Sequence, residues 1–116
     1  MFRFENLEIW KLAIDYAKDC YNLTNQFPAV EKFALSDQLR RAAISISNNI
    51  AEGSATSSAR FKNYLDISVG SAMETVNIIF FACELKYFDS KVKDIMYEKG
   101  EKLIRKMRSF KMSLND

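Results

Sequence analysis

The sequence predicts an all-α protein, an antiparallel up-and-down bundle of four helices. The first observation is the scarcity of helix-breaking residues: the 116 residues include one proline and three glycines, which argues against a turn-rich β fold. The second is that apolar residues recur at the helical period in four stretches joined by short connections. Hydrophobic residues make up 48% of the chain, so a single domain over residues 1–116 can bury a core. A three-helix core whose last helix is swapped onto a neighbouring chain is the alternative.

The first helix is predicted to begin near Asn6, a residue type that caps helix N-termini, with Glu8 in the first turn. Phe27 precedes Pro28 and therefore avoids the α conformation, which ends the helix. Two adjacent apolar stripes lie between these limits: Leu7, Trp10, Ile14, Ala17 and Tyr21, and Ile9, Leu12, Ala13, Tyr16, Cys20 and Leu23. An apolar arc this wide covers more than one neighbouring helix.

The second helix is predicted over residues 36–53, with Ser36 as its N-cap and Gly53 as a left-handed stop. Its core stripe comprises Leu35, Leu39, Ala42, Ala43, Ile46 and Ile50. A second, polar stripe comprises Gln38, Arg41, Ser45, Asn48, Asn49 and Glu52. Serine and asparagine cost helicity in mid-helix, so this face is expected to meet something polar. Arg41 is expected to pair with an acid such as Glu74 or Glu52, between helices or between subunits. A helix-turn-helix is less favoured, because the apolar pattern is continuous from Leu39 to Ile50.

The third helix is predicted over about residues 58–86, with a serine of the preceding loop as its cap, and it is the most apolar of the four. One broad face, which includes Phe80, is assigned to the core. A second apolar face is expected to meet another subunit, because a helix that is apolar nearly all round is buried on more than one side; its residues are Tyr64, Ile67, Ile78, Ala82 and Leu85. Gly70 costs about 1 kcal/mol of helix propensity against alanine, so we expect a packing reason for it.

The fourth helix is predicted to start at a cap formed by Asp89 or Ser90, and its outer half is basic. Arg105 and Arg108 are one turn apart, and Lys102 and Lys111 are expected to continue the row. Such a row is typical of phosphate binding, and the alternative is an ordinary solvated face. Arg40 on the second helix is assigned equally to solvent and to a phosphate contact.

The sequence offers little for catalysis. Histidine is absent, the glycines are scattered, and Cys20 and Cys83 are isolated among apolar neighbours, which indicates free thiols in a reducing compartment. We therefore expect no enzyme, no catalytic residue, no metal, no cofactor and no small-molecule substrate. The N-terminus has no apolar signal segment, and no uncharged apolar run is long enough to span a membrane, so a soluble cytoplasmic protein without a membrane partner is expected.

Several segments resemble one family. QLRRAAISISNNIAEG at residues 38–53, FKNYLDISVGSAMET at residues 61–75, the opening FENLEIWKLA, the Phe-Pro before Glu31 and the stretch from Phe33 to Gln38 are similar to bacterial 23S rRNA intervening-sequence proteins. Related proteins are accessory factors of diversity-generating retroelements. The resemblance implies a four-helix subunit, a symmetric ring of five subunits and no known catalysis. It also implies RNA, or a nucleoprotein that contains a reverse transcriptase, as the partner.

The positions that match the family are Gln38, Arg41, Ser45, Asn49, Glu52, Gly70, Ser71 and Glu74. All of these except Gly70 are predicted to form a structural polar network. Ser47, Thr56 and Ala59-Arg60 depart from the family pattern, and the loss of basic residues near the second loop favours the fourth helix as the nucleic-acid surface. The predicted function is a non-enzymatic oligomeric bundle that binds structured RNA through repeated basic surfaces. A scaffold that contacts only other proteins is the alternative.

Overall fold

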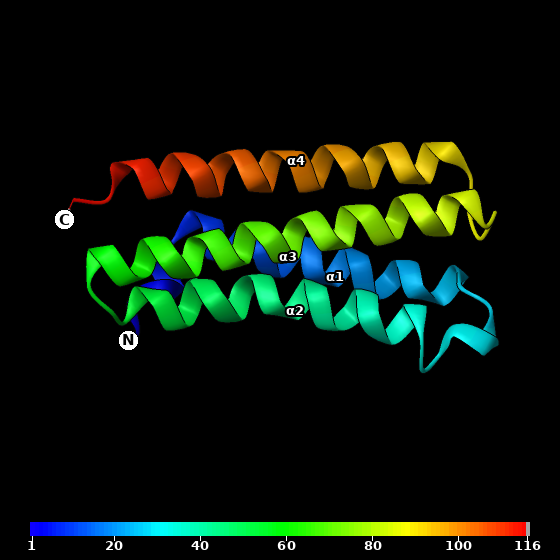
Figure 1. Cartoon of the computed structure of the whole chain (residues 1–116), viewed down its shortest axis with the longest axis horizontal. Helices are drawn as coiled ribbons and strands as arrows, with labels where there is room; N and C mark the ends of the chain where they lie inside the picture. Colours follow the sequence, from blue (N-terminus) through cyan, green and yellow to red (C-terminus); the bar gives the residue numbers. More distant parts are fainter. Residues whose placement is uncertain (116) are drawn as a thin grey trace.

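The computed structural model describes residues 1–115 and confirms an all-helical subunit, with no strand among those residues. Four helices run alternately up and down the long axis: α1 (Glu8–Leu23), α2 (Leu35–Ser54), α3 (Ser58–Glu84) and α4 (Ser90–Ser113) (Figure 1). The N- and C-termini lie at one end of the bundle, and the α1–α2 and α3–α4 connections lie at the other. Within the single chain α4 packs against α1 and α3, which is not the swapped arrangement considered as the alternative.

The first helix starts one residue later than expected. Arg3–Asn6 form a short 3-10 helix, and Leu7, in an extended conformation, is the N-cap of α1. Asn6 was therefore wrongly assigned as the cap. At the other end, Phe27 is extended before Pro28 as predicted, and two further 3-10 turns, Thr24–Gln26 and Ala29–Glu31, make up most of the connection to α2.

The start of α2 also differs from the prediction that Ser36 caps it. The helix begins at Leu35, Ala34 is the N-cap, and Ser36 is buried inside the first turn. The carboxylate of Glu31 accepts a hydrogen bond from the Leu35 amide at 3.4 Å. A side chain four residues upstream therefore performs the role that sequence spacing gave to Ser36.

Gly53 was wrongly predicted to adopt the left-handed conformation. No glycine has a positive φ in the part of the chain that the structure describes, and α2 continues through Gly53 to Ser54. A Cβ on Gly53 would lie 2.6 Å from the Cβ of Tyr64 and 2.7 Å from Cδ1 of Phe61. The glycine therefore permits close contact between the end of α2 and the start of α3.

The remaining caps and the α2 core follow the prediction. Ser57 accepts a hydrogen bond from the Arg60 amide at the start of α3, and Asp89 accepts one from the Val92 amide at the start of α4. Five of the six predicted core residues of α2 are buried, and Leu35 packs against the core while partly exposed. The two cysteines are free thiols, with Cys20 buried and Cys83 half-buried.

On α3 the division into faces differs from the prediction at three residues, one of which is Ala82, expected on the outer face but fully buried. Ile78, expected on the outer face, is only 3% exposed, whereas Phe80, expected in the core, is 39% exposed. Ser71 contacts Ser45 of α2, and Ile78 follows Ser71 by about two helical turns. Ile78 therefore lies on the side of α3 that faces α2. Phe80 lies at the α4 side, where its ring meets Tyr97.

One described helix, α3, is long and apolar enough by length and composition to cross a membrane. The same helix contributes Phe61, Leu65 and Ile79 to the buried centre of the bundle. A central helix of a bundle has this composition because neighbours cover it on several sides.

Candidate nucleic-acid interface

Three of the lysines on α4 form ion pairs with acids of the neighbouring helices. Lys99 contacts Asp19 at 2.9 Å and Lys106 contacts Glu8 at 3.1 Å, both on α1, while Lys111 contacts Asp66 of α3 at 2.7 Å. These pairs fasten α4 to its neighbours and neutralise much of the charge that the sequence places on this helix. Lys111 is therefore a weaker phosphate ligand than the sequence indicated.

The other predicted phosphate ligands, Lys102, Arg105 and Arg108, are exposed and have no ion-pair partner among residues 1–115. Lys102 and Lys111 do not belong to one row. Each step of three residues turns an α-helix by about 300°, so three such steps place Lys111 about half a turn away from Lys102. Lys102 lines a groove between α1 and α4, whereas Arg105 and Arg108 line another between α3 and α4.

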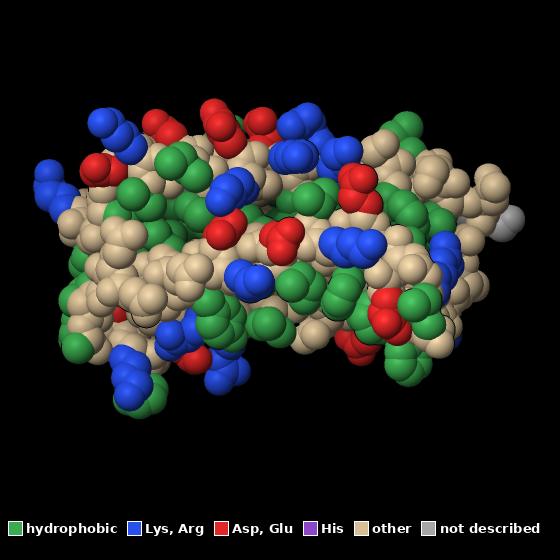
Figure 2. Space-filling view, turned by 180° about the vertical axis from the view of Figure 1, so that it is seen from behind, with side chains coloured by type: hydrophobic (Ala, Val, Ile, Leu, Met, Phe, Trp, Pro, Cys, Tyr) green, Lys and Arg blue, Asp and Glu red, His purple; other side chains and the backbone are tan. Residues whose placement is uncertain are grey.

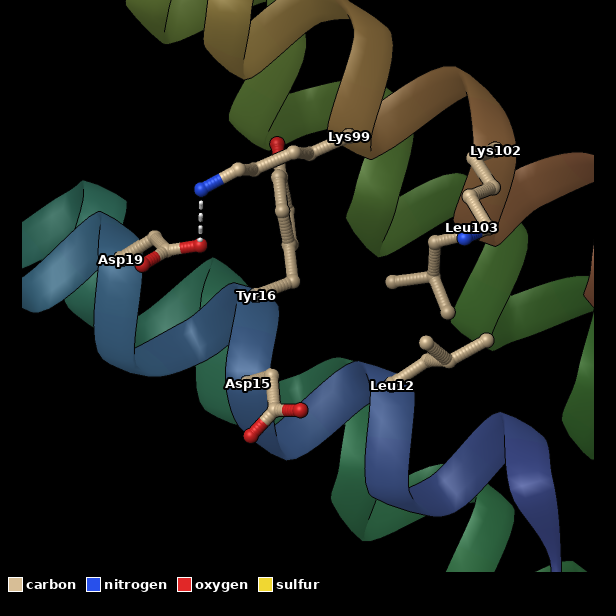
Figure 3. Close-up of a pocket in the computed structure, with 7 residues that line it drawn as sticks. All are labelled: Leu12, Asp15, Tyr16, Asp19, Lys99, Lys102 and Leu103. Atoms are coloured by element: carbon tan, nitrogen blue, oxygen red, sulfur yellow. Dashed lines mark hydrogen bonds and ion pairs between the residues drawn. The ribbon is translucent and has the colours of Figure 1, made fainter.

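The groove between α1 and α4 has balanced charge. Its volume is about 230 Å³, and Leu12 and Leu103 face one another within it while Lys99 reaches across to Asp19 (Figure 3). Asp15 and Lys102 supply the remaining charges on its rim. Basic and acidic side chains are intermixed over this face of the molecule, with hydrophobic ones between them (Figure 2). Such a surface does not create the single-sign field that attracts a polyanion.

The groove between α3 and α4 combines arginines with an aromatic ring. It has a volume of about 370 Å³, and its lining residues are Met73, Val76, Tyr97, Glu101, Ile104, Arg105 and Arg108. The Tyr97 ring is partly exposed and meets Phe80 edge-on, with centroids 5.9 Å apart and an interplanar angle of 79°. Tyr97 could not be recognised from the sequence, because a single tyrosine between charged residues carries no pattern of its own.

Arg40 does not line either groove, and its guanidinium is held by contacts within the subunit. It donates to Thr24 Oγ1 at 3.3 Å and to the Lys32 carbonyl at 3.4 Å, and its Cζ lies 6.0 Å from the centre of the Tyr21 ring. The side chain fastens α2 to the α1–α2 connection. This use of its donors favours a structural role over the phosphate contact considered from the sequence.

Part of the predicted polar network is present between α2 and α3. The hydroxyls of Ser45 and Ser71 lie 2.8 Å apart, and Asn49 Nδ2 donates to the Ser45 carbonyl at 2.8 Å and to Ser45 Oγ at 3.1 Å. Gln38 Nε2 donates to Glu74 Oε2 at 3.3 Å. These contacts join the two helices through short polar side chains, which explains their position in mid-helix.

Arg41 and Glu52 do not join this network. Arg41 forms an ion pair with Asp37, one turn earlier on α2, at 2.8 Å. Within the subunit it therefore does not pair with Glu74 or Glu52, and a pairing between subunits stays a prediction. Glu52 is exposed, and its side chain has no hydrogen bond or ion pair within residues 1–115. Both side chains face outward, on the side of α2 away from the core.

The residues predicted for a subunit interface are only partly accessible. Ile67 on α3 and Leu85, the residue that caps its C-terminus, are exposed, and Tyr64 is half-buried against Gly53. Ile78 and Ala82 are buried and cannot reach another subunit. Phe81, which the sequence analysis did not single out, is also exposed on α3. A Cβ on Gly70 would have no atom within 4 Å, so packing within the subunit does not explain this glycine.

Reactive groups are not gathered at any of these places. No cluster of three or more metal-ligating side chains occurs in the described residues. Burial raises the pKa of the Cys20 thiol to about 12, and burial likewise raises the pKa of Tyr16. Cys20 therefore stays a protonated, unreactive thiol at neutral pH.

Comparison with known proteins identifies a family. The family model described as 23S rRNA-intervening sequence protein matches residues 5–109, which is nearly the whole chain. No curated protein matches the chain.

Proposed function

Because the chain belongs to the family of 23S rRNA-intervening sequence proteins, we propose that it is a non-enzymatic helical bundle that assembles with copies of itself and binds structured RNA or an RNA–protein complex. The family description links its members to ribosomal RNA. Within this chain, the surface suited to such a partner is the α3–α4 groove with Arg105 and Arg108.

The observation that carries the proposal is the unpaired state of these two arginines. Acids on α1 and α3 neutralise Lys99, Lys106 and Lys111, whereas Arg105 and Arg108 have no acidic partner in the described chain. A guanidinium presents a planar set of donors that matches phosphate oxygens. Two such groups about one turn apart on one helix can contact neighbouring phosphates.

Self-assembly is the second part of the proposal. Ile67 and Phe81 on α3 and Leu85 at its C-cap are large exposed apolar residues. Gly70 has no side chain, so a second copy can approach the α3 backbone closely there. A neighbouring copy that covers this face would repeat the arginine pair around a symmetric ring, and the family resemblance favours five subunits. Repetition raises the affinity for an extended polyanion without any new contact within the subunit.

A protein-binding scaffold is the second candidate function. It is supported by the connection between α1 and α2, where Val30 and Phe33 are almost fully exposed at one end of the bundle. Tyr87 of the α3–α4 connection donates to Glu31 at 2.6 Å and holds this end together. An ordered loop with exposed apolar side chains is suited to contact with another protein.

A salt titration of RNA binding separates the two functions. We expect a folded RNA hairpin to bind with an affinity that falls steeply with salt. Replacing both arginines (Arg105→Gln with Arg108→Gln) should weaken binding and make the slope of log affinity against log salt shallower by about 2. The matched control, Lys11→Gln with Lys18→Gln on α1, removes the same charge and should leave the slope close to wild type. Absence of binding at low salt would exclude RNA binding and leave the scaffold.

A further inference from the structure

We propose that the α3–α4 groove binds one unpaired nucleotide, with its base against Tyr97 and its phosphate on Arg105 and Arg108. The inference rests on the proposed RNA binding and adds what part of an RNA the protein recognises. The α3–α4 groove differs in charge from the balanced α1–α4 groove. Among the described residues that line it, Glu101 is the one acid and Arg105 and Arg108 are the two bases.

The size and lining of the groove suit a flat, partly apolar ligand. Its volume of about 370 Å³ lies in the range of small-molecule sites. Met73, Val76 and Ile104 supply an apolar floor between the two helices, and the charged groups come from one side only, α4. A nucleobase has apolar faces and polar edges, so it can lie on such a floor with its edges toward α4.

Tyr97 supplies the stacking surface. Its side chain is 41% exposed, and its contact with Phe80 is edge-to-face rather than stacked. Lys93 Nζ lies 4.9 Å from the centre of the Phe80 ring, a cation–π contact that also holds this ring against α4. The supported tyrosine is therefore positioned for a base to stack on it, the contact by which proteins bind unpaired nucleotides.

The order of charges along α4 orients the ligand. Tyr97, Glu101 and Arg105 follow one another at intervals of four residues, or about 6 Å along the helix. Glu101 repels a phosphate but accepts a hydrogen bond from the exocyclic amino group of a base. The base therefore lies at Tyr97 and Glu101, and the phosphate lies further along the helix at Arg105 and Arg108. This arrangement favours adenine or cytosine over uracil.

A base in a duplex cannot use this site. Its faces are stacked on neighbouring base pairs and its Watson–Crick edge is paired. In loops and bulges, by contrast, both the faces and the Watson–Crick edge of a base are accessible to a protein. The groove is thus expected to select the unpaired parts of a structured RNA.

Fluorescence anisotropy with labelled RNAs tests the inference on the full chain. The probes are oligo(C), oligo(A) and oligo(U) of about 12 nucleotides and a duplex of the same number of phosphates. We expect oligo(C) and oligo(A) to bind more tightly than oligo(U), and the duplex to compete poorly. Tyr97→Ala should weaken oligo(C) binding about tenfold, while Tyr97→Phe, which keeps the ring, should bind like wild type. Glu101→Gln, whose amide both donates and accepts, should narrow the difference between oligo(C) and oligo(U).

The outcomes distinguish this inference from the proposed function. If no RNA binds, both are wrong. If RNA binds but the duplex competes as well as oligo(C), or Tyr97→Ala binds like wild type, the nucleotide site is wrong and RNA binding through the arginines stands. Light scattering on Tyr97→Ala supplies a second measurement, because dissociation of the assembly would assign the groove to contact between subunits and overturn the site.

Discussion

The hydroxyls of Tyr16 and Thr75 lie 2.8 Å apart in the buried core and connect α1 to α3. Thr75 Oγ1 also donates to the Ala72 carbonyl at 2.6 Å, so the proton shared with Tyr16 comes from the tyrosine. No buried side-chain nitrogen or oxygen lacks a partner within the described residues. The pair therefore places a polar contact in the core at no desolvation penalty from an unpaired group.

The first prediction follows from the direction of that hydrogen bond. Tyr16→Phe removes the donor and should lower the free energy of unfolding by about 1 kcal/mol. Thr75→Val leaves the tyrosine hydroxyl buried without its acceptor and should cost more, about 2 kcal/mol. Urea denaturation of both variants and of the double variant measures the coupling. If the loss of stability in the double variant equals the sum of the losses in the two single variants, the hydrogen bond contributes nothing to stability.

The second prediction contrasts two helical glycines. A Cβ on Gly100 would lie 2.9 Å from Val76 Cγ2 and 3.0 Å from the Tyr16 hydroxyl oxygen, whereas a Cβ on Gly70 would meet no atom within 4 Å. The stiff valine and the hydrogen-bonded tyrosine cannot move away easily, so Gly100→Ala should destabilise the subunit by about 1–3 kcal/mol. Within one subunit, Gly70→Ala should instead gain up to about 1 kcal/mol through helix propensity, whereas in the proposed assembly the added methyl group would oppose the close approach of a second copy. Thermal unfolding of the two variants is the measurement, and a stabilised Gly100→Ala variant would contradict it.

The sequence predicted the elements of this fold well, because apolar spacing depends on the chain alone. Leu39, Ala43, Ile46 and Ile50 are fully buried as their period indicated, and Ser57 and Asp89 cap the helices that follow them. Local rules failed where a distant side chain acts on the backbone. Phe61 and Tyr64 give Gly53 a packing role, and Glu31 bonds the Leu35 amide in place of Ser36.

The candidate site was less predictable, because it depends on which helices become neighbours. A wheel for α3 alone does not say that α2 covers Ile78 or that Phe80 meets Tyr97 at the border with α4. The charges of α4 likewise depend on α1 and α3, whose acids pair with Lys99 and Lys111, whereas Arg105 and Arg108 have no ion-pair partner among residues 1–115. Residues whose roles arise between helices need the three-dimensional arrangement.

The third prediction concerns stability at high pH. Burial raises the pKa of Cys20 from 9.0 to about 12 in the folded protein, so the folded chain keeps this proton at pH values where the unfolded chain loses it. Its contribution is fully present below about pH 9 and is lost as the pH rises from there toward 12. Burial raises the pKa of Tyr16 as well, which extends the loss to higher pH.

Urea denaturation between pH 8 and 11 measures this effect, with Cys20→Ala as the comparison. We expect the stability of the wild type to fall by up to about 1.4 kcal/mol per pH unit above pH 9 for this thiol, and that of Cys20→Ala to fall less. A thiol reagent should modify Cys83 first and Cys20 only on unfolding. Rapid modification of two thiols in the folded protein would show that Cys20 is accessible.

The last prediction tests self-assembly through the outer face of α3. Ile67 on α3 and Ile95 on α4 have the same side chain and nearly the same exposure, 53% and 55%, so one is a matched control for the other. If a second copy covers the α3 face, Ile67→Lys places an unpaired charge in that interface and should reduce the mass to that of one chain, 13.4 kDa. Ile95→Lys should leave the mass of the assembly unchanged, because Ile95 lies on α4, outside the proposed α3 interface. Light scattering with circular dichroism separates loss of assembly from loss of fold. A wild-type mass of 13.4 kDa would show that the protein does not assemble. Dissociation by Ile95→Lys but not by Ile67→Lys would place the interface on α4.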